Sequence, residues 1–131
     1  MQITYKVNPK ISSQEFIDLL KKTSLGERRP LDNPKIIEDM LAHADILITA
    51  NLNDKIIAIA RSVTDFSFCC YLSDLAVDES YQKMKIGQTL IDKTIEQLQP
   101  SCKLILLAAP LAVDYYGKIG FEKHPSAWTK N

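Results

Sequence analysis

The N-terminal third of the chain shows two helices after a short strand. Residues 2–7 alternate in polarity like an edge strand, and Ser12 with Glu15 then forms a capping-box pattern. Apolar residues follow the cap at helical spacing: Phe16, Ile17, Leu19 and Leu20. Residues 23–31 are polar and predict a loop, after which Asn33 and the proline behind it supply the N-cap and first turn of a second helix.

The middle of the chain predicts a hairpin, a further strand and a third helix. Residues 46–50 and 56–60 are short β-branched-rich runs separated by a polar cluster that suits a chain reversal. Residues 68–77 form another extended run. Apolar residues then recur at helical spacing until Pro100 stops them: Ile86, Leu90, Ile91, Ile95 and Leu98.

The C-terminal third predicts a buried strand and a short helix. Residues 103–109 are apolar after the first, as expected of a strand covered on both faces, and residues 110–118 indicate a helix that ends at Gly120. Because a helix connects residues 68–77 to this strand, the two strands should be parallel and joined by a right-handed crossover. The pattern therefore predicts a mixed α/β fold.

Composition narrows the class of protein. A chain of 131 residues with 46% apolar residues, no repeat and no low-complexity tract predicts one domain over residues 1–131. The 16 basic and 16 acidic residues cancel, which disfavours nucleic acid and membrane surfaces as partners and favours a small molecule. Without a membrane-spanning stretch or a signal-peptide core in residues 1–10, we expect a cytoplasmic protein.

The cysteines and histidines indicate neither a metal site nor a covalent intermediate. Cys69, Cys70 and Cys102 lack metal-ligand spacing, and reduced thiols are the simpler interpretation. No histidine is near the first two cysteines in sequence, so covalent catalysis is disfavoured. His43 and His124 have no partner at ligand spacing; we expect the former on a helix face and the latter in a final strand.

The turn after residues 68–77 is a candidate anion site. The first N–H groups of a helix have no intrahelical partners and carry partial positive charge, and Lys83 and Lys85 add mobile charge before Gly87 at the exit of the turn. Taken alone, the turn is somewhat better explained by a glycine that only permits close helix packing, with solvated lysines, than by phosphate binding. The glycine-rich fingerprints of Rossmann and P-loop nucleotide-binding proteins are absent.

The surroundings of this turn resemble a known motif. Leu75-Ala76-Val77, four residues, and then Gln82-x-x-x-x-Gly-x-x-Leu-Ile is similar to the acyl-CoA motif of the GNAT superfamily of N-acetyltransferases. The superfamily order of elements also matches over residues 2–128: strand, two helices, three antiparallel strands, motif helix, parallel strand, helix and final strand. The resemblance implies a three-layer α/β (α+β) fold with a mixed, mostly antiparallel twisted sheet, about four flanking helices, and one parallel strand pair splayed at the cofactor site.

The resemblance also implies an activity and a cofactor. We expect an acetyl-CoA-dependent N-acyltransferase that acetylates a primary amine of a small molecule or peptide by direct attack in a ternary complex, without a metal; a homodimer is left open. The residues expected to hold coenzyme A are those of the strand beside the pantetheine arm, the turn whose N–H groups bind the pyrophosphate, and one tyrosine: Leu75, Ala76, Val77, Gln82, Lys83, Met84, Lys85, Ile86, Gly87, Gln88 and Tyr116.

Two positions depart from the superfamily pattern. Lys85 replaces its first glycine, and Ala109 replaces an asparagine that many members carry seven residues before the functional tyrosine. If Lys85 needs a positive φ, the strain is on the order of 1 kcal/mol, which predicts weakened rather than lost binding. The departures keep an alternative open, a non-catalytic acyl-CoA-binding or sensing module.

Residues 112–121 resemble the second superfamily signature, in which Phe-Tyr precedes three residues and Gly-Phe. Tyr116 holds the position of the functional tyrosine. A hydroxyl with a pKa of about 10 can protonate a leaving thiolate whose conjugate acid has a pKa of about 8.5, so Tyr116 is the candidate general acid. The alternative is a core aromatic, a role expected of its neighbour Tyr115.

The base and the acceptor site are less constrained. Asp74 lies in an otherwise apolar strand beside the expected thioester, where partial burial would favour proton uptake, although a structural hydrogen bond to a loop fits equally well. The loop between the first two helices often shapes the acceptor pocket in the superfamily. Here it carries Glu27, Arg28 and Arg29, which suit an anionic acceptor or are simply solvated surface charges, the commoner situation.

Overall fold

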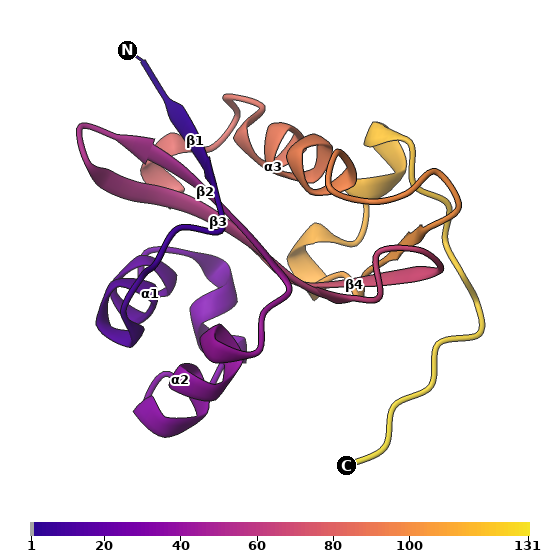
Figure 1. Ribbon diagram of the computed structural model, residues 1–131, viewed down its shortest axis with the longest axis horizontal. Helices are drawn as coiled ribbons and strands as arrows, with labels where there is room; N and C mark the ends of the chain where they lie inside the picture. Colours follow the sequence, from indigo (N-terminus) through magenta and orange to yellow (C-terminus); the bar gives the residue numbers. More distant parts are fainter. Residues whose placement is uncertain (1) are drawn as a thin grey trace.

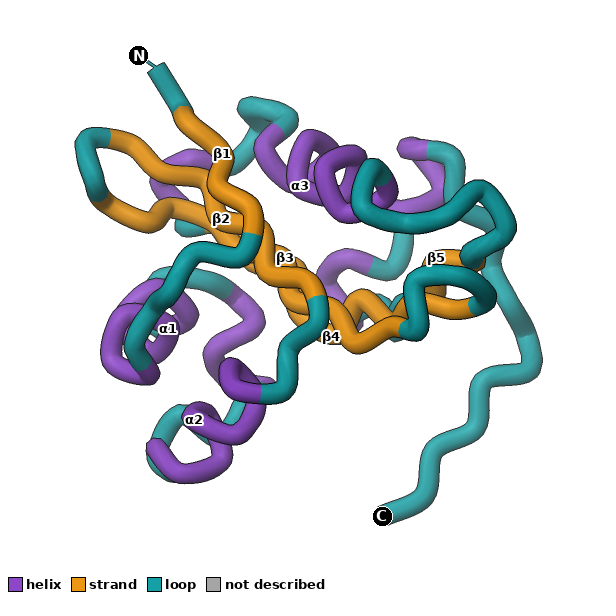
Figure 2. The backbone as a smooth tube through the Cα atoms, in the orientation of Figure 1, coloured by secondary structure: helices purple, strands orange, loops and turns teal. Residues whose placement is uncertain are grey.

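A five-stranded sheet, ordered β1-β2-β3-β4-β5, forms the centre of the computed structural model, which describes residues 2–131 (Figures 1 and 2). The strands are β1 (Thr4–Val7), β2 (Ile46–Leu52), β3 (Lys55–Thr64), β4 (Cys69–Val77) and β5 (Lys103–Ile105). The first four strands pair antiparallel, and β4 pairs with β5 in parallel. The predicted mixed sheet with one parallel pair is confirmed.

Helices cover both faces of this sheet, which gives three layers (Figure 1). Within residues 2–131 there are three α-helices, α1 (Ser13–Leu20), α2 (Pro34–Ala42) and α3 (Ile86–Ile95), rather than about four. The N-caps are those predicted: Glu15 N–H donates to Ser12 Oγ at 3.1 Å, and the Asn33 side chain accepts from Ile36 N–H at 3.4 Å. No helix of the described residues combines the length and apolar character that a membrane span requires.

Each face of the sheet carries its own core. α1 and α2 pack with the buried side chains of Leu47, Ile59 and Ala76. α3 packs on the other face through Ile86, Leu90 and Ile91, against a set of β2, β3 and β4 residues that includes Ile48, Ala60 and Leu72. β4 contributes Leu72 to one core and Ala76 to the other, so it is packed on both faces where the candidate site lies.

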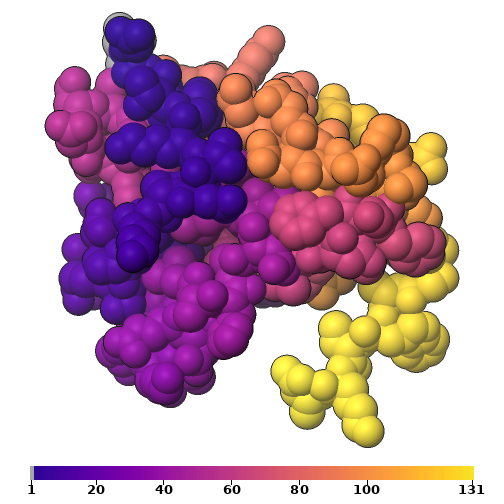
Figure 3. Space-filling model, in the orientation of Figure 1, coloured from indigo at the N-terminus to yellow at the C-terminus, as the bar shows by residue number. Residues whose placement is uncertain are grey.

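The chain after α3 differs from the prediction. β5 has only three residues and its Ile105 is 45% exposed, so it is not a strand covered on both faces. The expected helix over 110–118 is replaced by two short 3₁₀ turns, η3 (Pro110–Ala112) and η4 (Tyr116–Ile119). No strand forms between residues 121 and 131, and His124 lies in an exposed, extended segment that leaves the body of the molecule (Figure 3).

The reason for these differences is the divergence of β4 and β5. Their register runs from Cys69–Lys103 to Tyr71–Ile105 and then stops, while β4 continues to Val77. The apolar residues 106–109 therefore have no ladder partner, although their composition is that of a strand. The predicted splay of the parallel pair is present, and it leaves one edge of β4 uncovered.

Candidate functional site

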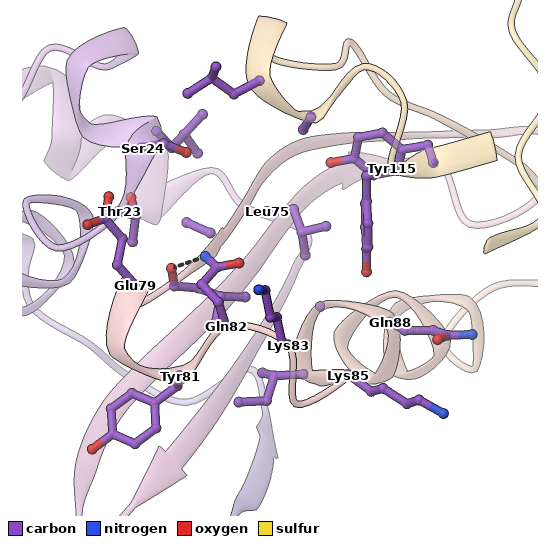
Figure 4. Close-up of a pocket in the computed structure, with 18 of the residues that line it drawn as sticks. Thr23, Ser24, Leu75, Glu79, Tyr81, Gln82, Lys83, Lys85, Gln88 and Tyr115 are labelled. Carbon is purple, nitrogen blue, oxygen red and sulfur yellow. Dashed lines mark hydrogen bonds between the residues drawn. The ribbon is translucent and has the colours of Figure 1, made fainter. Parts of the chain in front are cut away.

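A cleft of about 570 Å³ opens where β4 and β5 diverge (Figure 4). Its walls are β4, the first turn of α3, the 3₁₀ turns η1 (Ser24–Arg28) and η2 (Glu79–Tyr81), and the segment around η3 and η4. All but one of the residues predicted to hold the cofactor line it: Leu75, Ala76, Val77, Gln82, Lys83, Lys85, Ile86, Gly87, Gln88 and Tyr116. Met84 does not, and its side chain is 41% exposed.

The uncovered edge of β4 forms the floor of the cleft. Asp78 N–H donates to Ile57 O of β3 at 2.8 Å, and residues of an antiparallel strand turn alternately toward one neighbour and the other. Leu75 and Val77 therefore direct their backbone N–H and C=O groups away from β3, into the space that β5 has left. The Val77 C=O already accepts from Gln82 Nε2 at 3.1 Å, whereas both backbone groups of Leu75 face this space (Figure 4). An extended ligand with amide groups could pair with this edge as an additional strand would.

The turn between η2 and α3 presents backbone donors to the cleft. The first hydrogen bond of α3 runs from Thr89 N–H to Lys85 O at 3.1 Å, so the N–H groups of Ile86, Gly87 and Gln88 have no intrahelical acceptor. All three residues line the cleft. Together with the positive end of the helix dipole, they form a candidate anion site.

Two lysines of this turn adopt left-handed backbone conformations. Lys85, the N-cap of α3, has φ 59°, so the positive φ considered in the sequence is present, and Lys83 also has φ 67°, which the sequence did not reveal. In Figure 4 the Lys83 ammonium extends into the cleft, whereas the Lys85 side chain runs along the outside of α3. The turn is therefore strained at two positions, and one lysine faces the anion site.

Two tyrosines line the cleft beside the first turn of α3. The rings of Tyr115 and Tyr116 meet edge to face at 5.2 Å between centroids, and Tyr116 also packs edge to face on Phe121 at 5.5 Å. Burial raises the pKa of both hydroxyls, and the neighbouring Tyr115 raises that of Tyr116 further. Both hydroxyls are therefore held in the protonated form, as a proton donor at neutral pH requires.

Gly87 provides room for Tyr115. A Cβ at position 87 would lie 3.3 Å from Tyr115 Oη, closer than the 3.9 Å to Val77 Cγ2 of the sheet. The glycine thus serves the contact with a cleft tyrosine more than close packing on the sheet. Tyr115, which was expected to be a core aromatic, lines the cleft and is 38% exposed, whereas Tyr116 packs against the core on the α3 side.

Asp74 and Arg29, two further candidates, meet each other outside the cleft. The Asp74 side chain is completely buried; its Oδ1 accepts from Arg29 Nε at 2.6 Å and its Oδ2 accepts from Arg61 Nε. This is the arrangement of a structural hydrogen bond to a loop rather than of an accessible base. Glu27 and Arg28 are exposed, and neither they nor Arg29 line the cleft.

The sequence reasoning missed Arg61 and the η1 wall of the cleft. Arg61 is 6% exposed and directly follows the apolar run of β3, and an arginine there beside a lone aspartate in the next strand could have indicated their pairing. Thr23, Ser24 and Leu25 line the cleft from the end of α1 and η1. These residues lie in the segment read as a polar loop, and nothing in their own pattern indicates a ligand.

The cysteines lie outside the cleft, and the described residues show no cluster of metal-binding side chains. Burial raises the pKa of the Cys70 thiol, which disfavours the reactive thiolate. None of the three cysteines lines the cleft. Across residues 2–131, no cluster of three or more histidine, cysteine or acidic side chains has the arrangement of a metal site.

Comparison with known proteins places the chain among acetyltransferases. A model described as the acetyltransferase (GNAT) family matches residues 13–121. The chain is 29% identical over 126 residues to the uncharacterized N-acetyltransferase ycf52 of Pyropia yezoensis. This match covers 88% of this chain and 71% of that protein. It is 30% identical over 93 residues to the chloroplastic GCN5-related N-acetyltransferase 1 of Arabidopsis thaliana, covering 68% of this chain and 47% of that one.

Solved structures share the fold. A GNAT family acetyltransferase from Streptococcus pneumoniae superimposes with a TM-score of 0.79 at 21% identity, covering 98% of each chain. A predicted acetyltransferase from Clostridium acetobutylicum, solved with acetyl-CoA, has a TM-score of 0.69 at 19% identity and covers 99% of this chain and 96% of its own. At these identities the similarity concerns the fold.

Proposed function

The chain belongs to the GNAT family of acetyltransferases, and from that premise we propose that it binds acetyl-CoA in the cleft beside β4 and acetylates a primary amine. One observation carries the proposal: a free strand edge leads directly to a helix N-terminus with unpaired N–H groups. An elongated ligand with an amide-bearing arm and a pyrophosphate fits both features at once. Leu75 and the Val77 N–H would pair with the arm, because the Val77 C=O already accepts from Gln82 Nε2, and residues 82–88 would hold the pyrophosphate.

The reaction proposed is direct transfer in a ternary complex. The amine nitrogen attacks the thioester carbonyl carbon, a C–N bond forms, the C–S bond breaks, and the electron pair leaves on sulfur. The amine first loses its ammonium proton to solvent at the open mouth of the cleft, and it attacks as the neutral amine. Tyr116 gives its hydroxyl proton to the thiolate, the acylated nitrogen releases its second proton to solvent, and Tyr116 takes a proton back from solvent to complete the cycle. Asp74 has no place as the base in this proposal, because two guanidinium groups enclose its buried carboxylate.

Thiol release from acetyl-CoA over a panel of amines tests the proposal. The panel should include peptide N-termini, polyamines and amino sugars. We expect Tyr116→Phe to lower turnover about 100-fold while the dissociation constant of acetyl-CoA stays unchanged. Tyr115→Phe is the matched control, because it removes a neighbouring cleft hydroxyl. Unchanged turnover in Tyr116→Phe would remove the role of that tyrosine.

A second candidate function is a non-catalytic acyl-CoA-binding or sensing module. The observation that favours it is the pair of left-handed lysines, Lys83 and Lys85, in the turn expected to hold the pyrophosphate, together with Ala109 near the expected arm. Such a module would bind acetyl-CoA and release no thiol with any amine of the panel. An active wild-type protein excludes it.

A further inference from the structure

Two arginines hold the most deeply buried charge of the described chain from opposite sides. Arg29 comes from the segment after η1, Arg61 from β3 and Asp74 from β4. The Asp74 side chain is 0% exposed, and each of its oxygens accepts from one arginine Nε. We refer to Arg29, Arg61 and Asp74 as the arginine clamp. Asp74 and Arg61 are buried and Arg29 is partly buried, and the free-energy cost of burying charges makes such a cluster weak evidence for stability alone.

The clamp also grips the residue at which β4 bends. The β3–β4 register passes from Arg61–Asp74 to Ser62–Leu72, so Ser73 is an extra residue, a β-bulge. Ser73 O accepts from Arg29 Nη2 at 2.7 Å, and Ser73 Oγ accepts from Arg61 Nη2 at 3.1 Å. The same two guanidinium groups therefore fix both the carboxylate and the bulge.

The bulge lies where the cleft begins. The last β4–β5 pair is Tyr71–Ile105, two residues before Ser73, and Leu75 is the first β4 residue that lines the cleft. A bulge bends and twists its strand, which accounts for the divergence of β4 from β5. The clamp is thus located at the hinge between the paired and the unpaired part of β4.

Arg29 connects two walls of the cleft. It is the C-cap of η1, and Ser24 at the start of η1 lines the cleft on the side opposite Tyr115 (Figure 4). Through Asp74 and Ser73 its guanidinium binds β4, the floor. Its remaining Nη1 donates to Arg28 O at 2.8 Å, which fixes the guanidinium to its own loop.

We propose that Arg29 is a positioning residue, which holds the η1 wall against the bulge of β4 and so sets the width of the channel for the pantetheine arm without touching the cofactor. This inference rests on the proposed function. It gives Asp74 a role as the anchor of the clamp. It also predicts that Arg29 acts on one part of coenzyme A only, because the anion site at residues 82–88 belongs to different elements.

Removing Arg29 is the informative change because the rest of the clamp stays neutralised. In Arg29→Met the Asp74 carboxylate retains Arg61, so no buried charge is left unpaired. Removing Asp74 would instead leave two cations facing each other. Arg28→Met is the matched control, since the Arg28 side chain is exposed and contributes only its carbonyl oxygen. Arg29→Lys is a second variant. It keeps the charge, but a single ammonium group cannot donate to both Asp74 and Ser73 O as the planar guanidinium does.

Binding of acetyl-CoA and of ADP, measured by calorimetry on the full chain, tests the inference. ADP carries a pyrophosphate and lacks the pantetheine arm. We expect Arg29→Met to weaken acetyl-CoA binding roughly five- to tenfold and Arg29→Lys by a smaller factor, with ADP binding unchanged in both and neither affinity changed in Arg28→Met.

The contrary outcomes are distinct. Unchanged acetyl-CoA affinity in Arg29→Met, or equal losses for acetyl-CoA and ADP, would overturn the positioning role. If Arg29→Met does not fold, Arg29→Lys decides by the same two affinities. A wild-type protein that binds no acetyl-CoA would overturn the proposed function itself, before any variant is compared.

Discussion

Lys83 and Lys85 have left-handed backbone conformations in the turn proposed to hold the pyrophosphate, so this turn is strained where its N–H groups face the cleft. Lys85 has φ 59° and ψ 20°, and its side chain runs along α3 (Figure 4). Glycine takes this conformation freely, so Lys85→Gly should raise the free energy of unfolding by up to about 1 kcal/mol, measured by denaturant titration. Acetyl-CoA affinity should hold or improve. A weakened affinity would instead show that the Lys85 ammonium contacts phosphate.

Lys83 differs from Lys85 in the direction of its side chain. Because its ammonium extends into the cleft, Lys83→Met should weaken acetyl-CoA binding about fivefold and flatten the dependence of affinity on salt. Lys85→Met is the matched control, since it removes the same charge from the same turn. Equal losses in the two variants would contradict the orientation of the side chains.

The raised pKa of Tyr116 predicts how turnover and stability depend on pH. Burial, and then Tyr115, raise the pKa of the Tyr116 hydroxyl above its ordinary value of about 10. A general acid works in its protonated form, so turnover should not decline on account of this group until the pH exceeds about 10. The contribution of the protonated Tyr116 hydroxyl to the free energy of unfolding is likewise complete below the pKa of the unfolded state. It is lost as the pH rises through the higher pKa of the folded state. A Tyr116-dependent loss of turnover between pH 7 and 9 would contradict the assignment.

Among the elements, those with capping or turn chemistry were predictable and those that depend on a neighbour were not. Ser12 and Asn33 fixed the starts of α1 and α2 correctly. The polar cluster after β2 makes a tight turn with Asn53 and Asp54 both at positive φ. Residues 106–109 have the composition of a strand, but β4 has diverged from them, and a divergence caused by the Ser73 bulge leaves no mark in hydrophobic patterning.

The η1 wall depends on a glycine. A Cβ at Gly26 would lie 2.4 Å from the Leu20 carbonyl oxygen, so Gly26→Ala must displace η1 from the end of α1. We expect a loss of about 1–3 kcal/mol in the free energy of unfolding and weaker acetyl-CoA binding. Gly117→Ala is the control, because a Cβ there meets nothing within 4 Å. Equal stability of the two variants would argue against the close approach of η1 to α1.

At the scale of the whole molecule, the site combines one contiguous motif with residues gathered from distant segments. Residues 75–88 follow one another in the chain, so their resemblance to an acyl-CoA motif could be recognised from the sequence. That resemblance was enough to predict which of them lie along the cleft, with the exception of Met84. The arginine clamp joins positions 29, 61 and 74 from three elements. No spacing rule links such positions, and for Asp74 the sequence therefore left two interpretations open, a general base and a structural hydrogen bond to a loop.

The central claim is that the cleft beside β4 is an acetyl-CoA site, and thermal unfolding with separate ligands tests it most directly. Acetyl-CoA at a hundred times its dissociation constant should stabilise the fold by about 2.7 kcal/mol, which raises the melting temperature of a domain of this size by roughly 10 °C. ATP and NAD, which lack the arm that β4 would pair with, should give much smaller shifts. Stabilisation by ATP or NAD without stabilisation by acetyl-CoA would contradict the account.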